Sequence, residues 1–187
     1  MKGRTGSIRH PHSAAMSFHA APRPRFTAHT WLALAGWLAL TFATAAIGGV
    51  ASVQAPAFYA QLTQPSWSPP PGVFGPVWTV LYAVMAIAAW LVWREPASGA
   101  RRRTLTLFCL QLVLNGLWSW LFFAWHLGAW ALADIALLWL TVAATLTGFW
   151  RIKPLAGALL VPYLAWISFA AALNVTLWRM NPQLLGG

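Results

Sequence analysis

The chain has 187 residues, of which 59% are hydrophobic and only 7% are charged. This composition excludes an ordinary water-soluble globular domain, in which about a quarter of the residues are charged. The net charge of +10 follows a membrane-topology pattern described below, so we expect no nucleic-acid partner.

The N-terminal residues 1–26 are rich in Arg, His, Pro and Ser, and they predict a disordered basic arm. Residues 27–187 are predicted to form one all-α domain, an integral membrane bundle of five transmembrane helices. Each apolar run holds about 20 residues or slightly more, enough to cross about 30 Å of hydrocarbon. The predicted spans are residues 31–53, 74–93, 105–125, 129–150 and 155–178.

The connection between the first two spans, from about Gln54 to Gly72, contains five prolines in "PAFYAQLTQPSWSPPPG". Proline fixes φ and removes a backbone donor, so we predict a stiff, irregular and non-helical loop. Its aromatic residues Tyr59 and Trp67 would then face the ends of the neighbouring helices. The other connections are short.

The basic residues predict the orientation of the bundle. All of the twelve Lys and Arg except Arg179 fall in the arm, in the connection between the second and third spans, or between the fourth and fifth spans. With five spans these three segments share one side of the membrane. The positive-inside rule therefore predicts a cytoplasmic N-terminus, an external C-terminus and contact with membrane lipid.

The two acidic residues differ in position. Glu95 follows the second span, where we expect it to be solvated or paired with an arginine. Asp134 lies within the fourth span, where a carboxylate is costly unless it faces protein or water. Two interpretations stay open for Asp134: a ligand-binding role, or structural pairing with a Trp indole or an Asn.

Aromatic and amide residues recur at helical spacing in three spans. Ordinary helix packing explains each stripe taken alone. Their depth favours a shared site, because they fall in the outer half or near mid-depth, below the proline-rich loop. We predict an aromatic, sparsely polar pocket for a flat polycyclic ligand, under a lid. Its residues are Tyr59, Trp67, Trp78, Tyr82, Asn115, Trp118, Asp134, Trp166, Ala170 and Asn174.

No residue constellation indicates hydrolytic, phosphoryl-transfer or metal chemistry. Cys109 is the single cysteine, and His126 lies in a short turn at the predicted membrane surface. No Ser/His/Asp array, phosphate loop or carboxylate pair is present. We therefore assign no catalytic acid or base and no metal site, and we expect no obligatory cofactor.

Several segments together resemble the TspO/MBR family of tryptophan-rich sensory and translocator proteins. The matching segments cover about residues 56–181, in the order found in that family. They are "FYAQLTQPSWSPPPGVFGPVWTVLYAVM", "LVWRE", "QLVLNGLWSWLFF", "WALADIALL" and "PYLAWISFAAALNVTLWRMN".

The resemblance implies a five-helix bundle, commonly a homodimer, that binds porphyrins and other tetrapyrroles, sterols or isoquinoline-type ligands. It implies that Trp78, Tyr82, Asn115, Trp166 and Ala170 line the ligand site. It also implies lid contacts from Tyr59 and Trp67, and it matches Asp134 to an acidic position of the family.

The resemblance implies a membrane sensor or translocator that binds porphyrin. One alternative is a light-dependent porphyrin-degrading enzyme that uses Trp78 and Trp166. The other is a sterol or lipid transporter. Sterol recognition of the kind described in animal members needs a basic residue within about five residues after a tyrosine. The next basic residue after Tyr163 is Arg179, which favours a bacterial-type tetrapyrrole role and a bacterial inner membrane.

Overall fold

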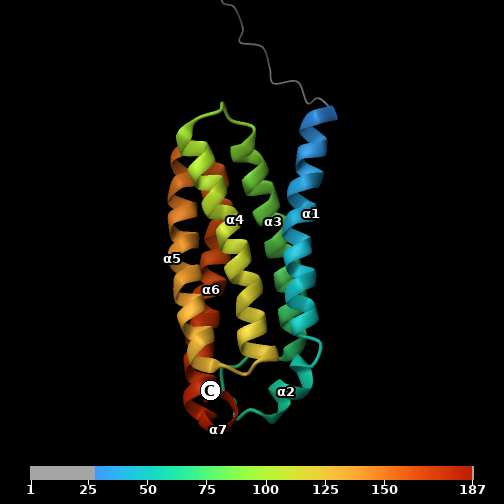
Figure 1. The fold of residues 1–187 in the computed structure, drawn as a ribbon, viewed down its shortest axis with the longest axis vertical. Helices are drawn as coiled ribbons and strands as arrows, with labels where there is room; N and C mark the ends of the chain where they lie inside the picture. Colours follow the sequence, from blue (N-terminus) through green and yellow to red (C-terminus); the bar gives the residue numbers. More distant parts are fainter. Residues whose placement is uncertain (1–27, 187) are drawn as a thin grey trace, which may run out of the picture.

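The computed structural model describes residues 28–186, so the predicted arm at 1–26 lies outside the described residues (Figure 1). Five of its helices are long and apolar enough to cross a membrane, which confirms the all-α membrane fold. They are α1 (Ala28–Ala51), α3 (Phe74–Trp93), α4 (Gly99–Ser119), α5 (Gly128–Ile152) and α6 (Pro154–Met180).

The long helices form a ring in the order α1, α3, α6, α5 and α4, in which each packs against the next and α4 closes the ring against α1. In Figure 1 one end of the bundle carries the start of α1 and the connections α3–α4 and α5–α6. The opposite end carries α2 (Ala55–Gln61), the α4–α5 turn and α7 (Pro182–Leu185). We call these the basic end and the lid end.

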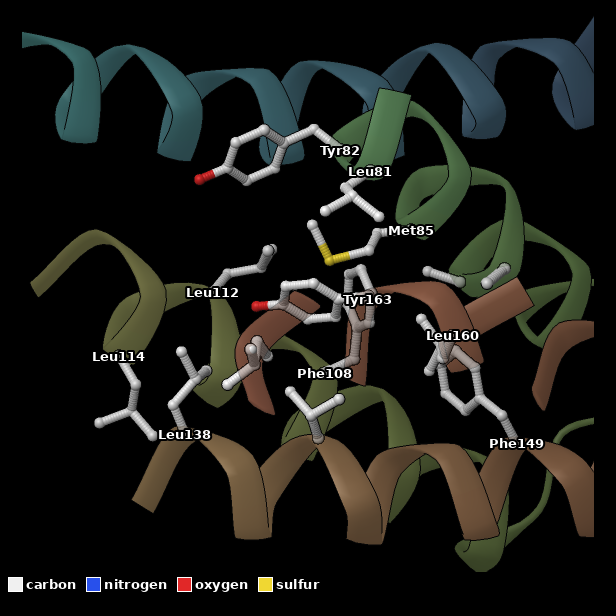
Figure 2. Packing of buried hydrophobic residues seen from close by; sticks show 14 of the residues in the cluster. Leu81, Tyr82, Met85, Phe108, Leu112, Leu114, Leu138, Phe149, Leu160 and Tyr163 are labelled. Carbon is white, nitrogen blue, oxygen red and sulfur yellow. The ribbon is translucent and has the colours of Figure 1, made fainter. Parts of the chain in front are cut away.

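Four of the five long helices share the main core. Figure 2 shows side chains of these four helices gathered in one cluster, with Tyr82 and Met85 from α3, Leu112 from α4, Leu138 from α5 and Tyr163 from α6. Helix α1 contributes only partly buried residues, such as Trp37, to this cluster. It is the least buried of the spanning helices, so it is the peripheral member of the bundle.

The third span begins earlier than hydropathy predicted. Helix α4 starts at Gly99 because the Ser98 hydroxyl accepts a hydrogen bond from the Arg101 backbone N–H at 3.1 Å, a side-chain N-cap. Arg101 Nη1 also donates to the carbonyl oxygens of Trp93 and Glu95, at 2.9 and 2.6 Å. The arginine run therefore forms the first turns of a helix and caps the end of α3 instead of lying in a loop.

The prediction of a non-helical connection between the first two spans is wrong for half of its length. Residues Ala55–Gln61 form α2, and Pro71–Val73 form a short 3₁₀ helix, η1, that leads into α3. Pro56 occupies the first turn of α2, where no backbone N–H is needed and the fixed φ suits a helix. The proline-rich part that follows is irregular, as predicted.

Glu95, which we expected to be solvated or paired with an arginine, is partly exposed and pairs with a lysine instead. Its carboxylate pairs with Lys153 Nζ at 3.0 Å, across the basic end of the bundle. This ion pair joins the end of α3 to the start of α6. Both side chains are partly exposed, so its contribution to stability is small, at about 0–1 kcal/mol.

Candidate ligand-binding site

A cavity of about 420 Å³ lies inside the lid end of the bundle. Its walls come from α1, α3, α4 and α6, and α2 and η1 cover its end. This volume falls in the range of small-molecule sites in proteins, about 300–1,000 Å³. The lining residues are Phe42, Ala45, Gly48, Gly49, Ser52, Ala55, Pro56, Tyr59, Pro71, Phe74, Gly75, Trp78, Thr79, Tyr82, Asn115, Trp118, Ser119, Phe123, Trp166 and Ala170.

Aromatic rings make up much of the cavity wall. Trp78 stacks on Tyr82 with ring centroids 5.4 Å apart, and it meets Trp166 edge to face at 6.5 Å. Phe74 contacts Trp166 in the same edge-on manner at 5.9 Å. These mutual contacts fix the rings in place, so the cavity presents a rigid aromatic surface to any occupant.

The polar groups at the base of the cavity are bonded to one another. The Tyr82 hydroxyl donates to Asn115 Oδ1, and Asn115 Nδ2 donates to the Tyr163 hydroxyl at 3.1 Å. None of the described residues that line the cavity is charged. The cavity therefore favours an apolar, flat occupant and offers few polar groups to fix its orientation.

The structure brings together seven of the ten predicted site residues on the cavity wall: Tyr59, Trp78, Tyr82, Asn115, Trp118, Trp166 and Ala170. Trp67, Asp134 and Asn174 do not line it. Trp67 packs edge-on against Phe169 at 5.9 Å and is 47% exposed. It therefore lies near the Trp166 side of the site but outside the cavity.

Asn174 supports the wall from behind. Its Oδ1 accepts a hydrogen bond from Trp118 Nε1 at 3.1 Å, and its Nδ2 donates to the Gly128 carbonyl oxygen at 3.2 Å. These two bonds tie the cavity residue Trp118 of α4 to α6 and to the start of α5. Asn174 thus positions a wall residue without touching the cavity.

Asp134 is buried in α5, and its Oδ2 has no hydrogen-bond partner within residues 28–186. The predicted structural pairing of Asp134 with a Trp indole or an Asn is therefore not observed among these residues. The carboxyl group does not reach the cavity either. Within the same residues no group of His, Cys, Asp or Glu could hold a metal ion.

Sequence reasoning missed the whole α1 wall, which comprises Phe42, Ala45, Gly48, Gly49 and Ser52. Their spacing of three or four residues places them on one helix face, and this periodicity was the available signal. Small residues in a sequence do not by themselves indicate a cavity wall, because they are also typical of close packing between helices. Here they do both, since a Cβ built on Gly48 would lie 3.1 Å from Ser119 Oγ of α4.

The lid, defined as residues 55–71, is held to the end of α6 and to the α4–α5 turn. Asn181 Oδ1 accepts from the Thr63 backbone N–H at 2.7 Å, and Asn181 Nδ2 donates to the Thr63 carbonyl oxygen at 2.9 Å. Phe58 stacks on His126 of the α4–α5 turn with centroids 4.0 Å apart. His126 has a left-handed backbone conformation, with φ of 56°.

Comparison with known proteins places this cavity in a family context. The TspO/MBR family model matches residues 37–179. The human translocator protein is 42% identical over 132 residues, covering 70% of this chain and 78% of its own length. The tryptophan-rich protein TspO of Chlorobaculum tepidum is 40% identical over 129 residues, covering 67% and 80%.

A further relative is the tryptophan-rich sensory protein of Cereibacter sphaeroides, which is 40% identical over 124 residues and covers 66% of this chain and 77% of its own length. The match of the family model spans most of the chain. It includes every residue that lines the cavity. The chain is a multi-pass integral membrane protein and belongs to the TspO/MBR family of sensory and translocator proteins.

Proposed function

We propose that the protein binds a porphyrin or related tetrapyrrole in this cavity and acts as a membrane sensor or translocator for it. The observation that carries the proposal is the uncharged aromatic cavity of about 420 Å³ between α1, α3, α4 and α6. Indole and phenol rings stack well on a flat conjugated macrocycle. An aliphatic polycycle such as a sterol gains less from these rings, so it is the weaker fit.

The absence of charge among the described lining residues also predicts how a porphyrin would lie. Burying an unpaired carboxylate is very costly. The propionate groups would therefore stay at the lid end, toward the membrane surface, and the ring would lie in the cavity. A porphyrin whose propionates are esterified should bind at least as tightly as the free acid.

The test is quenching of tryptophan fluorescence of the full-length protein in lipid nanodiscs by protoporphyrin IX and by its dimethyl ester. Saturable quenching by both, with the ester no weaker, supports the proposal. Binding that requires free propionates would contradict the predicted pose. Absence of saturable quenching by either compound would remove the tetrapyrrole proposal altogether.

A second function is favoured by the edge-on contact of Trp78 and Trp166 on the wall, 6.5 Å apart. A light-excited porphyrin could take one electron from an indole, giving a porphyrin radical anion and an indole radical cation, with dioxygen as the co-reactant for ring oxidation. Loss of porphyrin absorbance that needs protein, light and oxygen together, and that disappears in Trp166→Phe, would support this enzyme. Stable porphyrin absorbance under light would contradict the enzyme and favour a protein that only binds porphyrin.

We also propose a homodimer in a bacterial inner membrane with the N-terminus in the cytoplasm. The basic end holds Arg94, Arg101–Arg103, Arg151 and Lys153, as the positive-inside rule requires of a cytoplasmic face. Mass measurement of the protein in nanodiscs tests the dimer. A mass of one chain per disc under dilute reconstitution would contradict it.

A further inference from the structure

Apart from Pro56 and Pro71 of the lid, the exposed lining residues all lie on one side of the cavity wall, between α1 and α3. Of the lining residues, those of α4 and α6 are buried or partly buried, whereas Phe42 and Gly49 of α1 and Gly75 and Thr79 of α3 are exposed. We call these four residues the slot. A Cβ built on Gly49 or Gly75 would meet no atom within 4 Å, so the space beside them is free.

The other edge of α1 is closed. A Cβ on Gly48 would lie 3.1 Å from Ser119 Oγ, and one on Gly116 would lie 3.7 Å from the Thr44 side chain. Helix α1 therefore seals the cavity against α4. Toward the basic end α1 also touches α3, where Trp90 Nε1 donates to the Thr30 carbonyl oxygen at 2.9 Å. The opening between α1 and α3 is confined to the lid-end half of these helices.

The slot lies within the membrane-spanning segments and is suited to contact with hydrocarbon. Thr79 is five residues beyond the start of α3, about 8 Å along the helix. Its hydroxyl donates to the Gly75 carbonyl oxygen at 2.9 Å, and the Ser52 hydroxyl beside the slot donates to the Gly48 carbonyl oxygen at 2.8 Å. No hydroxyl is left needing water at this opening.

In contrast to the slot, the route under the lid is closed by several contacts. The two Asn181–Thr63 hydrogen bonds and the Phe58–His126 stack hold the lid to the end of α6 and to the α4–α5 turn. The Tyr59 hydroxyl is also hydrogen bonded to Ser68 within the lid. A ligand that entered from the aqueous side would have to break several of these contacts. One that entered through the slot would break none of them and would pass only the Phe42 ring, whose centroid lies 6.4 Å from that of Tyr82.

We propose that the ligand enters and leaves the cavity sideways, from the bilayer, through the slot between α1 and α3. The ligand class is a flat, largely apolar molecule that first dissolves in the lipid. The proposal deepens the binding function above, on which the identity of the ligand rests. The side from which the cavity is reached is a property of the fold and can be tested without porphyrin.

The porphyrin-independent test uses a single cysteine inside the cavity, Ala170→Cys with Cys109→Ser, in phosphatidylcholine vesicles. N-(1-pyrenyl)maleimide, which partitions into the bilayer, should label this cysteine faster than a sulfonated, water-soluble maleimide. Gly49→Phe should slow labelling by the pyrenyl reagent at least tenfold. The matched control Gly36→Phe, on α1 outside the cavity and also in open space, should not.

The lid arm of the test is Asn181→Ala, which removes both bonds to Thr63 and should not speed labelling by either reagent. Faster labelling in Asn181→Ala together with no effect of Gly49→Phe would overturn the proposal in favour of a route under the lid. So would faster labelling by the water-soluble reagent, or no labelling by the pyrenyl reagent. If Gly49→Phe does not fold, Thr79→Phe blocks the facing wall instead.

Stopped-flow quenching by protoporphyrin IX adds the ligand itself. Both its association and dissociation rates should fall at least tenfold in Gly49→Phe and stay unchanged in Gly36→Phe. Unchanged rates in Gly49→Phe would contradict the slot as the ligand's route. If the unmodified protein shows no quenching, the binding function fails while the labelling result still decides the route.

Discussion

Ala170 is a small residue on the α6 wall of the cavity, one helical turn after Trp166. Ala170→Leu would place a larger side chain into the space beside the indole. We expect porphyrin affinity to fall tenfold or more, about 1.4 kcal/mol, in a fluorescence titration. Ala172→Leu, on the exposed side of the same helix, is the matched control. A folded Ala170→Leu variant with normal affinity would show that α6 does not contact the ligand.

Asn174 acts at the same scale through its neighbour. Asn174→Ala leaves the Trp118 indole N–H without its acceptor and removes a second donor from the Gly128 carbonyl oxygen, which keeps its helical bond within α5. An unsatisfied buried donor costs about 1–3 kcal/mol, so we expect a clearly lower melting temperature in detergent. Thr176→Ala, which removes only an exposed hydroxyl bonded within α6, should change little. Equal melting of the two variants would mean that Trp118 finds another acceptor.

At the residue scale, the sequence indicated the wall wherever a large side chain recurred at helical spacing. Trp78 and Tyr82 on α3 are one such pair, and both line the cavity. The same spacing placed Asn174 on the stripe of Trp166 and Ala170, but one further turn carried its amide away from the cavity and toward Trp118. Spacing gives a helix face, but the direction of a face toward a cavity or a neighbour depends on packing between helices.

At the scale of elements, hydropathy located every span and the end of the third span at Ala124 to within one residue, but it missed the start of α4 and the change of helix type near its end. Its first turns contain three consecutive arginines, and its last residues change to a π-helix at Trp120–Ala124. In this π-helical turn the Trp125 N–H donates to the Trp120 carbonyl oxygen at 2.8 Å. An average of hydropathy does not predict a helix cap or a change of helical pitch, because both depend on individual hydrogen bonds.

The close approach of α5 and α6 depends on Gly157. A Cβ there would lie 2.7 Å from Cα of Trp150, which is backbone and cannot rotate away. We expect Gly157→Ala to push the two helices apart and to lower stability by about 1–3 kcal/mol, seen as earlier thermal unfolding. Gly36→Ala has no atom within 4 Å of the new Cβ and should melt like the original protein. A Gly157→Ala variant of full stability would show that the helices can separate at no cost.

For the whole molecule, a bundle of five spanning helices followed from the lengths of the apolar runs. The order of the helices around the ring did not follow, because many arrangements satisfy the same connections. The structure sets α1 at the periphery against α3 and α4, and this arrangement leaves the slot. The cavity belongs to the assembled bundle, since four helices supply its walls.

Orientation is tested on the whole molecule with two reporter fusions. Alkaline phosphatase, which is active only outside the cytoplasm, should be active when fused after Gly187 and inactive when fused after Ala97, in the α3–α4 connection at the basic end. A green fluorescent protein should show the opposite pattern. Active phosphatase after Ala97 would place the basic end outside and contradict the positive-inside prediction.

The Asn181–Thr63 clamp joins residues 118 positions apart in the chain. During synthesis Thr63 leaves the ribosome long before Asn181 exists, so the lid lacks this clamp while the later helices are being inserted and has only contacts such as the Phe58–His126 stack to hold it. The lid is therefore fully fastened only in one of the last steps of biogenesis. A chain truncated just before Asn181 would keep all five spanning helices, yet its lid would lack the clamp and would cover the aromatic cavity less firmly.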